Sequence, residues 1–148
     1  MIDLPTDLPA DLVPLSWLRG VWEGSGVIDY AVGDTTLRGE FTHRVSFSHD
    51  GTDALTYSAI AWLTGDGQGE NFDEGDPRRV PLVSEAGFWR LSRPLGDADA
   101  GPGLLPATAP APARTVDDVE ALRTSEDGFE VEASIVHSDG VCELYLGQ

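Results

Sequence analysis

Residues 17–30, WLRGVWEGSGVIDY, decide the fold that the sequence predicts. From Trp22 to Tyr30 every second position carries a large apolar residue or a glycine, and Glu23, Ser25 and Asp29 fall on the other face. A period of two is typical of a β-strand. Glycines inside a strand are costly in entropy, so their presence indicates tight bending or a close approach by another backbone or a ligand. We therefore expect the curved first strand of a β-barrel, with one face formed by Trp22, Gly24, Gly26, Ile28 and Tyr30.

A short helical turn is expected directly before this strand. Pro14 suits the first position of a helix and Gly20 suits its C-terminal cap. In a barrel such a turn plugs one end, and Trp17 is then expected to face the core as a packing residue.

The rest of the chain repeats the strand pattern between short turns rich in glycine and aspartate. About seven short strands joined as a meander predict an all-β protein, closed as a barrel or a sandwich, which the pattern alone does not distinguish. An exposed loop is expected over residues 65–79. The strands after the first are expected over residues 37–48, 55–64, 80–93, 116–123, 129–137 and 141–146.

The length of the chain fits one domain. With 148 residues and 41% apolar content, residues 1–148 can bury a sizeable core. Residues 95–113 form a tract of glycine, alanine and proline with few side chains that could pack, so we expect a disordered loop insertion there.

Charge and cysteine content restrict the partners and the compartment. The net charge of −17 would repel phosphate backbones and anionic membrane surfaces, so we expect neither nucleic acid nor a membrane as partner. A single cysteine, Cys142, excludes an internal disulfide, and the N-terminus lacks the pattern of a signal peptide. The expected location is the cytoplasm.

Four short motifs occur along the chain in a fixed order. They are Gly20-x-Trp22-x-Gly24-x-Gly26, Phe47-Ser48-His49-x-Gly51, Glu85-x-Gly87-x-x-Arg90 and Gly140-x-x-Glu143-x-x-Gly147. In this order they resemble the nitrobindin family, haem-binding β-barrels similar to fatty-acid-binding proteins and lipocalins. The resemblance implies a ten-stranded antiparallel meander barrel, of which about seven strands fall within this sequence and the C-terminal ones do not. It also implies haem b as the family's cofactor and, as activities, nitric oxide binding and conversion of peroxynitrite to nitrate.

The haem ligands that the resemblance implies are not found in this sequence. The family's proximal histidine lies in the last strand region, beyond Gln148, and a second haem-side histidine corresponds to Val83. We therefore expect a nitrobindin-like protein that binds no haem and has no enzymatic activity. The alternatives are a haem-dependent peroxynitrite isomerase, if a C-terminal histidine exists, and an intracellular carrier of an apolar ligand such as a fatty acid.

A ligand cavity would be lined by the large side chains on the inner face of the strands. The same side chains would fill a solid core equally well. An open edge over residues 141–146 could also pair with a second copy of the chain. The candidate lining residues are Trp22, Tyr30, Phe41, His43, Phe47, Tyr57, Val83, Glu85 and Trp89.

The histidines and inward carboxylates have simpler interpretations. We expect His43 to be a hydrogen-bonded wall residue, His137 a solvated turn residue, and His49 to bind backbone in the turn before Gly51. Glu85 is expected to point inward and to pair with an arginine, and Glu143 to be structural. The sequence identifies no catalytic residue and no metal site. The exposed loop expected over residues 65–79 is acidic, but it lacks the ligand spacing of a calcium-binding loop.

Overall fold

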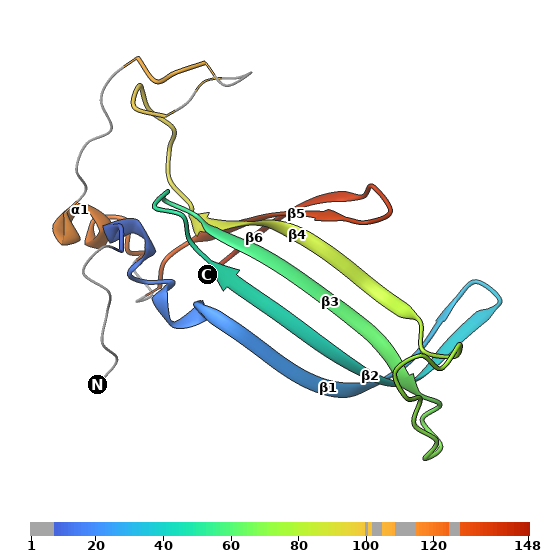
Figure 1. Cartoon of the computed structure of the whole chain (residues 1–148). Coiled ribbons are helices and arrows are strands. Elements are labelled where there is room, and N and C mark those ends of the chain that lie inside the picture. Colours follow the sequence, from blue (N-terminus) through green and yellow to red (C-terminus); the bar gives the residue numbers. More distant parts are fainter. Residues whose placement is uncertain (1–7, 100, 102–104, 109–114, 125–127) are drawn as a thin grey trace.

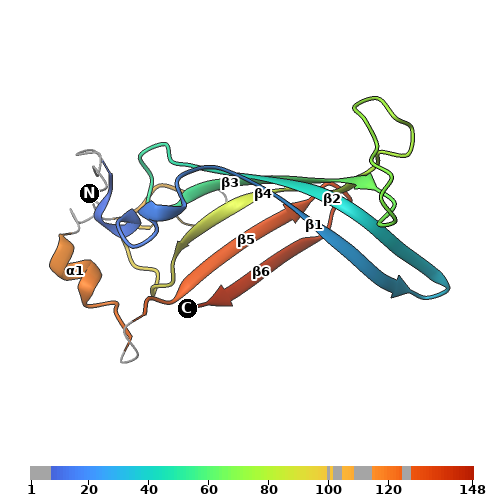
Figure 2. The same cartoon turned by 90° about the horizontal axis from the view of Figure 1, so that it is seen from below.

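The protein is a single curled antiparallel sheet. The computed structural model describes residues 8–99, 101, 105–108, 115–124 and 128–148. Each strand pairs with the next in the chain, so the sheet order is β1 to β6 without a crossover. In Figures 1 and 2 the sheet curves into a half-barrel. The all-β meander is therefore confirmed, with strands β1 (Gly20–Val32), β2 (Thr35–Ser48), β3 (Leu55–Gly65), β4 (Pro81–Leu91), β5 (Val131–His137) and β6 (Cys142–Gly147).

The pairing register confirms the predicted faces. His43 on β2 lies opposite Gly24 on β1 and Ala61 on β3, and Ala61 in turn lies opposite Val83 on β4. Because side chains alternate between faces, residues opposite one another in neighbouring strands share a face. All of the predicted lining residues fall on this one face, which we call the concave face.

One end of the concave face is closed by short helices (Figure 2). The 3₁₀ turns η1 (Ala10–Leu12) and η2 (Ser16–Leu18) precede β1, and helix α1 (Val116–Glu120) packs beside η1. The expected helical turn before the first strand is thus confirmed. The main core lies at this end and contains Leu12, Leu15, Phe47, Leu55, Leu91 and Val119.

The prediction that Trp17 faces the core is wrong, since 62% of its surface is exposed. A 3₁₀ helix has three residues per turn, so Leu15 and Leu18 lie on the same side and take the core positions. Leu15 is buried and Leu18 packs against the core cluster. Trp17, which falls between them, is directed away from the core.

The strand expected over residues 116–123 is wrong, because this segment contains helix α1. Thr115 accepts a hydrogen bond from the backbone N–H of Asp118, and the Asp118 carboxylate accepts one from the backbone N–H of Thr115. This capping box satisfies two donors at the helix start, and Asp117 and Asp118 favour the positive end of the helix dipole. The described residues therefore form six strands in place of about seven.

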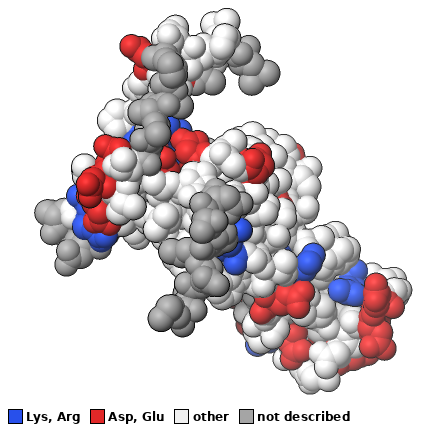
Figure 3. Space-filling view, turned by 60° about the vertical axis from the view of Figure 1, so that its left-hand side comes forward, with Lys and Arg blue, Asp and Glu red and all other residues white. Residues whose placement is uncertain are grey.

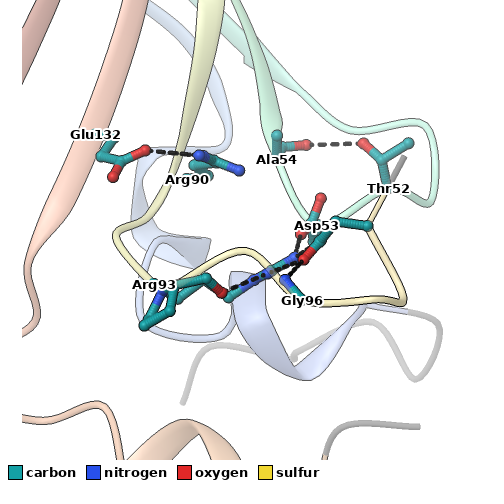
Figure 4. A network of polar contacts seen from close by, with 9 residues as sticks. Thr52, Asp53, Ala54, Arg90, Arg93, Gly96 and Glu132 are labelled. Atoms are coloured by element: carbon teal, nitrogen blue, oxygen red, sulfur yellow. Dashed lines mark hydrogen bonds and ion pairs between the residues drawn. The ribbon is translucent and has the colours of Figure 1, made fainter. Parts of the chain in front are cut away.

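Ion pairs fasten the segment after β4 to its neighbours (Figure 4). Arg93, whose side chain is 9% exposed, binds Asp53 at 2.8 Å and also pairs with Asp99. The backbone N–H of Gly96 donates to Asp99 at 2.7 Å. The disorder expected over residues 95–113 falls partly on residues 100, 102–104 and 109–113, which lie outside the described residues, and stays a prediction.

The ion pair between Arg90 and Glu132 makes the stability of the sheet pH-dependent. Hydrogen bonds from Arg90 and Ser92 lower the pKa of Glu132 below its usual value. A carboxyl group with a depressed pKa in the folded state stabilises the fold above its unfolded pKa, and this stability is lost as the pH falls through the folded pKa. We expect Glu132→Gln to flatten the acid limb of the stability profile, measured by urea unfolding between pH 7 and pH 3. Glu23→Gln, which removes an exposed partner of Arg44, serves as the control, and equal flattening in both variants would contradict the prediction.

Candidate functional site

A chain of polar side chains crosses the concave face from β3 to β6. The hydroxyl of Tyr57 donates to Oε2 of Glu85 at 2.8 Å, and Nδ1 of His137 lies 3.9 Å from Oε1 of Glu85. On its other side, Nε2 of His137 lies 2.8 Å from Oε2 of Glu143, which also accepts from the hydroxyl of Tyr145. Both nitrogens of His137 thus face carboxylates. We call these five residues the polar chain.

The polar chain fixes the protonation of its tyrosine donors. Burial raises the pKa of Tyr57 far above its usual value, and the hydrogen bond to Glu85 raises it further. Hydrogen bonds from Tyr145 and His137 lower the pKa of Glu143. At neutral pH the phenols therefore remain donors and Glu143 remains a carboxylate acceptor.

An aromatic cluster lies between the polar chain and the short helices that close one end of the concave face. The ring of Phe47 is 5.3 Å from that of Tyr57 and 5.6 Å from that of Trp89, measured between centroids. The indole Nε1 of Trp89 is buried, and no described residue accepts its hydrogen. A buried donor without an acceptor costs free energy.

A largely apolar groove of about 410 Å³ opens beside Trp89. It runs between η2 and the ends of β5 and β6, and the exposed Trp17 stands at its wall. Such a concave, apolar surface with few polar groups is typical of small-molecule sites. Its lining includes Leu15, Trp17, Trp89, Phe129, Val131 and Tyr145.

His43 is the half-buried imidazole of the concave face outside the polar chain. Its position in the wall is confirmed, whereas none of the described residues supplies the hydrogen bond that we expected. Its neighbours across the strands, Gly24 and Ala61, have small side chains or none. A Cβ added at Gly24 would meet nothing within 4 Å, so this part of the concave face is open.

The structure corrects two of the expected site residues. His137 is not a solvated turn residue, because it ends β5 on the concave face with a side chain only 23% exposed. Glu85 does point inward, but it binds Tyr57 and not an arginine. Arg90 lies one position out of phase with Glu85 and Trp89, so it projects from the other face, where it binds Glu132.

Two other expectations agree with the geometry. The backbone N–H of Gly51 donates to Nδ1 of His49 at 3.3 Å, which confirms that His49 serves the turn. Glu143 holds His137 and Tyr145 in place, as a structural carboxylate would. Sequence reasoning did not identify Tyr145 or the polar chain. The alternation of Val131, Ala133, Ile135 and His137 was the signal that places His137 on the concave face.

The described residues form neither a metal-binding cluster nor a membrane-spanning helix. Among them, no group of three or more histidine, cysteine, aspartate or glutamate side chains is arranged to hold a metal ion. None of the helices that the structure describes has the length and apolar character needed to cross a membrane.

Comparison with known proteins identifies related sequences over the whole chain. The family model described as a THAP4-like, heme-binding beta-barrel domain matches residues 11–148. A protein named peroxynitrite isomerase from Leifsonia xyli subsp. xyli is 55% identical over 148 residues, which is 100% of this chain and 69% of the relative. A protein of the same name from Clavibacter michiganensis subsp. michiganensis is 54% identical, over 100% of this chain and 69% of the relative. Another, from Pseudarthrobacter chlorophenolicus, is 47% identical, over 99% of this chain and 67% of the relative.

Proposed function

The chain belongs to the family of THAP4-like, haem-binding β-barrel domains, and on that premise we propose that its concave face is a wall of the haem pocket of a peroxynitrite isomerase. This is the alternative that the sequence allowed if a C-terminal histidine exists, and it is chosen here over the expectation that haem binding is lost. The relatives that carry the isomerase name match this chain along its full length.

The residues of the concave face fit a haem. A porphyrin is a flat apolar group, and the open part of the concave face around Gly24, Ala61 and Val83 offers it apolar surface. Position 83, where the resemblance implies an imidazole, carries a valine on the concave face.

The observation that carries the proposal is the position of His43. Its imidazole shares a rung of the sheet with Ala61 and Val83, and none of the described side chains binds it. Imidazole is a common ligand of haem iron and a frequent proton shuttle near neutral pH. By contrast, Nε2 of His137 is hydrogen-bonded to Glu143 at 2.8 Å and Nδ1 lies 3.9 Å from Glu85, so this imidazole is less available to a ligand than that of His43.

The roles of the concave-face residues follow from their contacts. When bound, haem would supply an iron centre at which peroxynitrite rearranges to nitrate. His43 would contact the pocket's contents through an imidazole that none of the described side chains binds. Tyr57 and Tyr145 keep the carboxylates of Glu85 and Glu143 hydrogen-bonded, so that these anions do not face the apolar ligand unpaired.

The activity is tested by mixing peroxynitrite with the haem-loaded full-length protein and following its decay and the nitrate yield. We expect decay faster than with free haemin, and His43→Ala to lower the rate constant by about tenfold or more, as is typical for loss of a general acid or base. Thr42→Ala, a neighbour on the opposite face, should leave the rate unchanged. Decay no faster than with haemin alone would refute the proposed function.

A further inference from the structure

We propose that the convex face, opposite the concave face, carries a binding site for a small oxyanion centred on Arg79. A groove of about 530 Å³ is lined by residues of β1, β2 and β3 and by Arg79, which lies in the segment before β4. Its lining includes two arginines, two hydroxyl side chains and one indole. The lining residues used here are Glu23, Ser25, Thr42, Arg44, Trp62 and Arg79.

The Arg79 guanidinium is held in a fixed position. Its central carbon lies 5.3 Å from the centroid of the Trp62 ring, so the cation stacks against the indole. The backbone on either side is anchored, because the N–H of Arg79 donates to the carbonyl of Asp76 and the carbonyl of Val80 accepts from the N–H of Leu63, both at 2.9 Å. A preorganised guanidinium loses little freedom when it binds a ligand.

The same guanidinium lacks an anion. Within the described residues Arg79 forms no ion pair, and its buried Nε has no hydrogen-bond partner. A buried N–H without an acceptor costs free energy that a bound oxygen would recover. Six other arginines do pair with a carboxylate, namely Arg38, Arg44, Arg78, Arg90, Arg93 and Arg123.

The remaining lining favours an oxyanion over a cation. Arg44 and Glu23 form an ion pair at 3.3 Å, so their charges offset each other and the charge of Arg79 remains. The hydroxyls of Ser25 and Thr42 add neutral donors. This local positive charge occurs in a protein of net charge −17, and on the face shown in Figure 3 acidic and basic side chains lie close together.

The chemistry of guanidinium indicates the ligand class. Its planar fork of donors matches two oxygens of a carboxylate or a phosphate. Both share the oxyanion chemistry that the groove supplies, and either could come from a metabolite or from a side chain of another molecule. Gly24 and His43 also border the groove, but the proposal does not depend on the proposed function, because the side chains of Ser25, Thr42 and Trp62 project from the face opposite that of His43.

The site is tested by titrating inorganic phosphate, and separately acetate, into the full-length protein while the arginine Nε–Hε signals are followed by NMR. We expect a saturable shift of the Arg79 signal with at least one of the two anions. In Arg79→Gln the affinity should fall about tenfold, the change expected when a charged hydrogen-bond donor is lost. Arg19→Gln removes the same charge outside the groove and is expected to leave the affinity unchanged.

The phosphate and acetate titrations distinguish the two ligand classes and define the results that would overturn the proposal. Saturation by phosphate alone assigns a phosphate site, and saturation by acetate alone assigns a carboxylate site. Small linear shifts at all arginines would mean an adventitious ion only and would overturn the proposal. So would saturable binding that Arg79→Gln leaves intact. Neither result would affect peroxynitrite decay, so this proposal and the proposed function fail independently.

Discussion

Replacing Gly87 by valine is expected to destabilise the protein by about 3 kcal/mol or more, a large part of the stability of a typical domain. A Cβ at position 87 would lie 2.0 Å from the backbone oxygen of Ser134 and 3.0 Å from Cα of Ile135. Both atoms belong to the backbone of β5, so a side-chain rotation cannot relieve the clash. β4 and β5 would have to separate, and Glu85 and His137 are paired across the same two strands.

Urea unfolding followed by tryptophan fluorescence measures this effect. Gly24→Val is the matched control, because a Cβ at that strand position meets nothing within 4 Å. The midpoint for Gly24→Val should stay close to that of the wild type, while that of Gly87→Val falls sharply. Similar urea midpoints for the two variants would contradict the close contact between β4 and β5 at Gly87.

Replacing Val83 by tryptophan is expected to weaken haemin binding by between tenfold and a hundredfold. This is the cost of placing extra side-chain volume in the space that the haem would occupy. Val83 lies on the concave face, on the same rung as Ala61 and His43. An indole there would occupy part of the surface on which we place the haem. The measurement is a haemin titration of the full-length variant followed by Soret absorbance.

The neighbouring residue provides the control for this substitution. Ser84 pairs with Ile60 and projects from the convex face, so Ser84→Trp adds the same indole on the other side of the sheet. Its haemin affinity should equal that of the wild type. Equal weakening in both variants would indicate a general effect on folding and would remove this support for a concave-face site.

The alternation of side chains predicted most of the sheet, because a period of two fixes which residues share a face. It placed Trp22, His43, Tyr57 and Trp89 together before any pairing was known, and the register confirms that grouping. The glycines of the first strand agree in part with the tight bending that they predicted. Gly20 has a φ of +127°, which glycine adopts far more readily than other residues where the chain turns into β1.

The segment over residues 116–123 shows where this reasoning fails. Val116 and Val119 resemble strand residues, but the apolar period over so short a segment does not separate strand from helix. The capping box between Thr115 and Asp118 favours the helix locally. The Thr-x-x-Asp pattern was present in the sequence and is the signal that would have corrected the prediction.

The polar chain could not be predicted because its contacts depend on register between strands that are distant in sequence. Tyr57 and Glu85 are 28 residues apart, and their contact requires β3 and β4 to pair with the observed alignment. His137 was assigned to a turn because Ser138 to Gly140 follow it. The strand extends through His137, and this single residue joins Glu85 to Glu143.

Haemin titration of the wild-type full-length protein, followed by Soret absorbance, tests the central claim most directly. The concave-face account predicts a saturable one-to-one Soret change that is weakened by His43→Ala and unaffected by Thr42→Ala. Weak binding that does not saturate would contradict it. That result would instead support the expectation that this member of the family binds no haem.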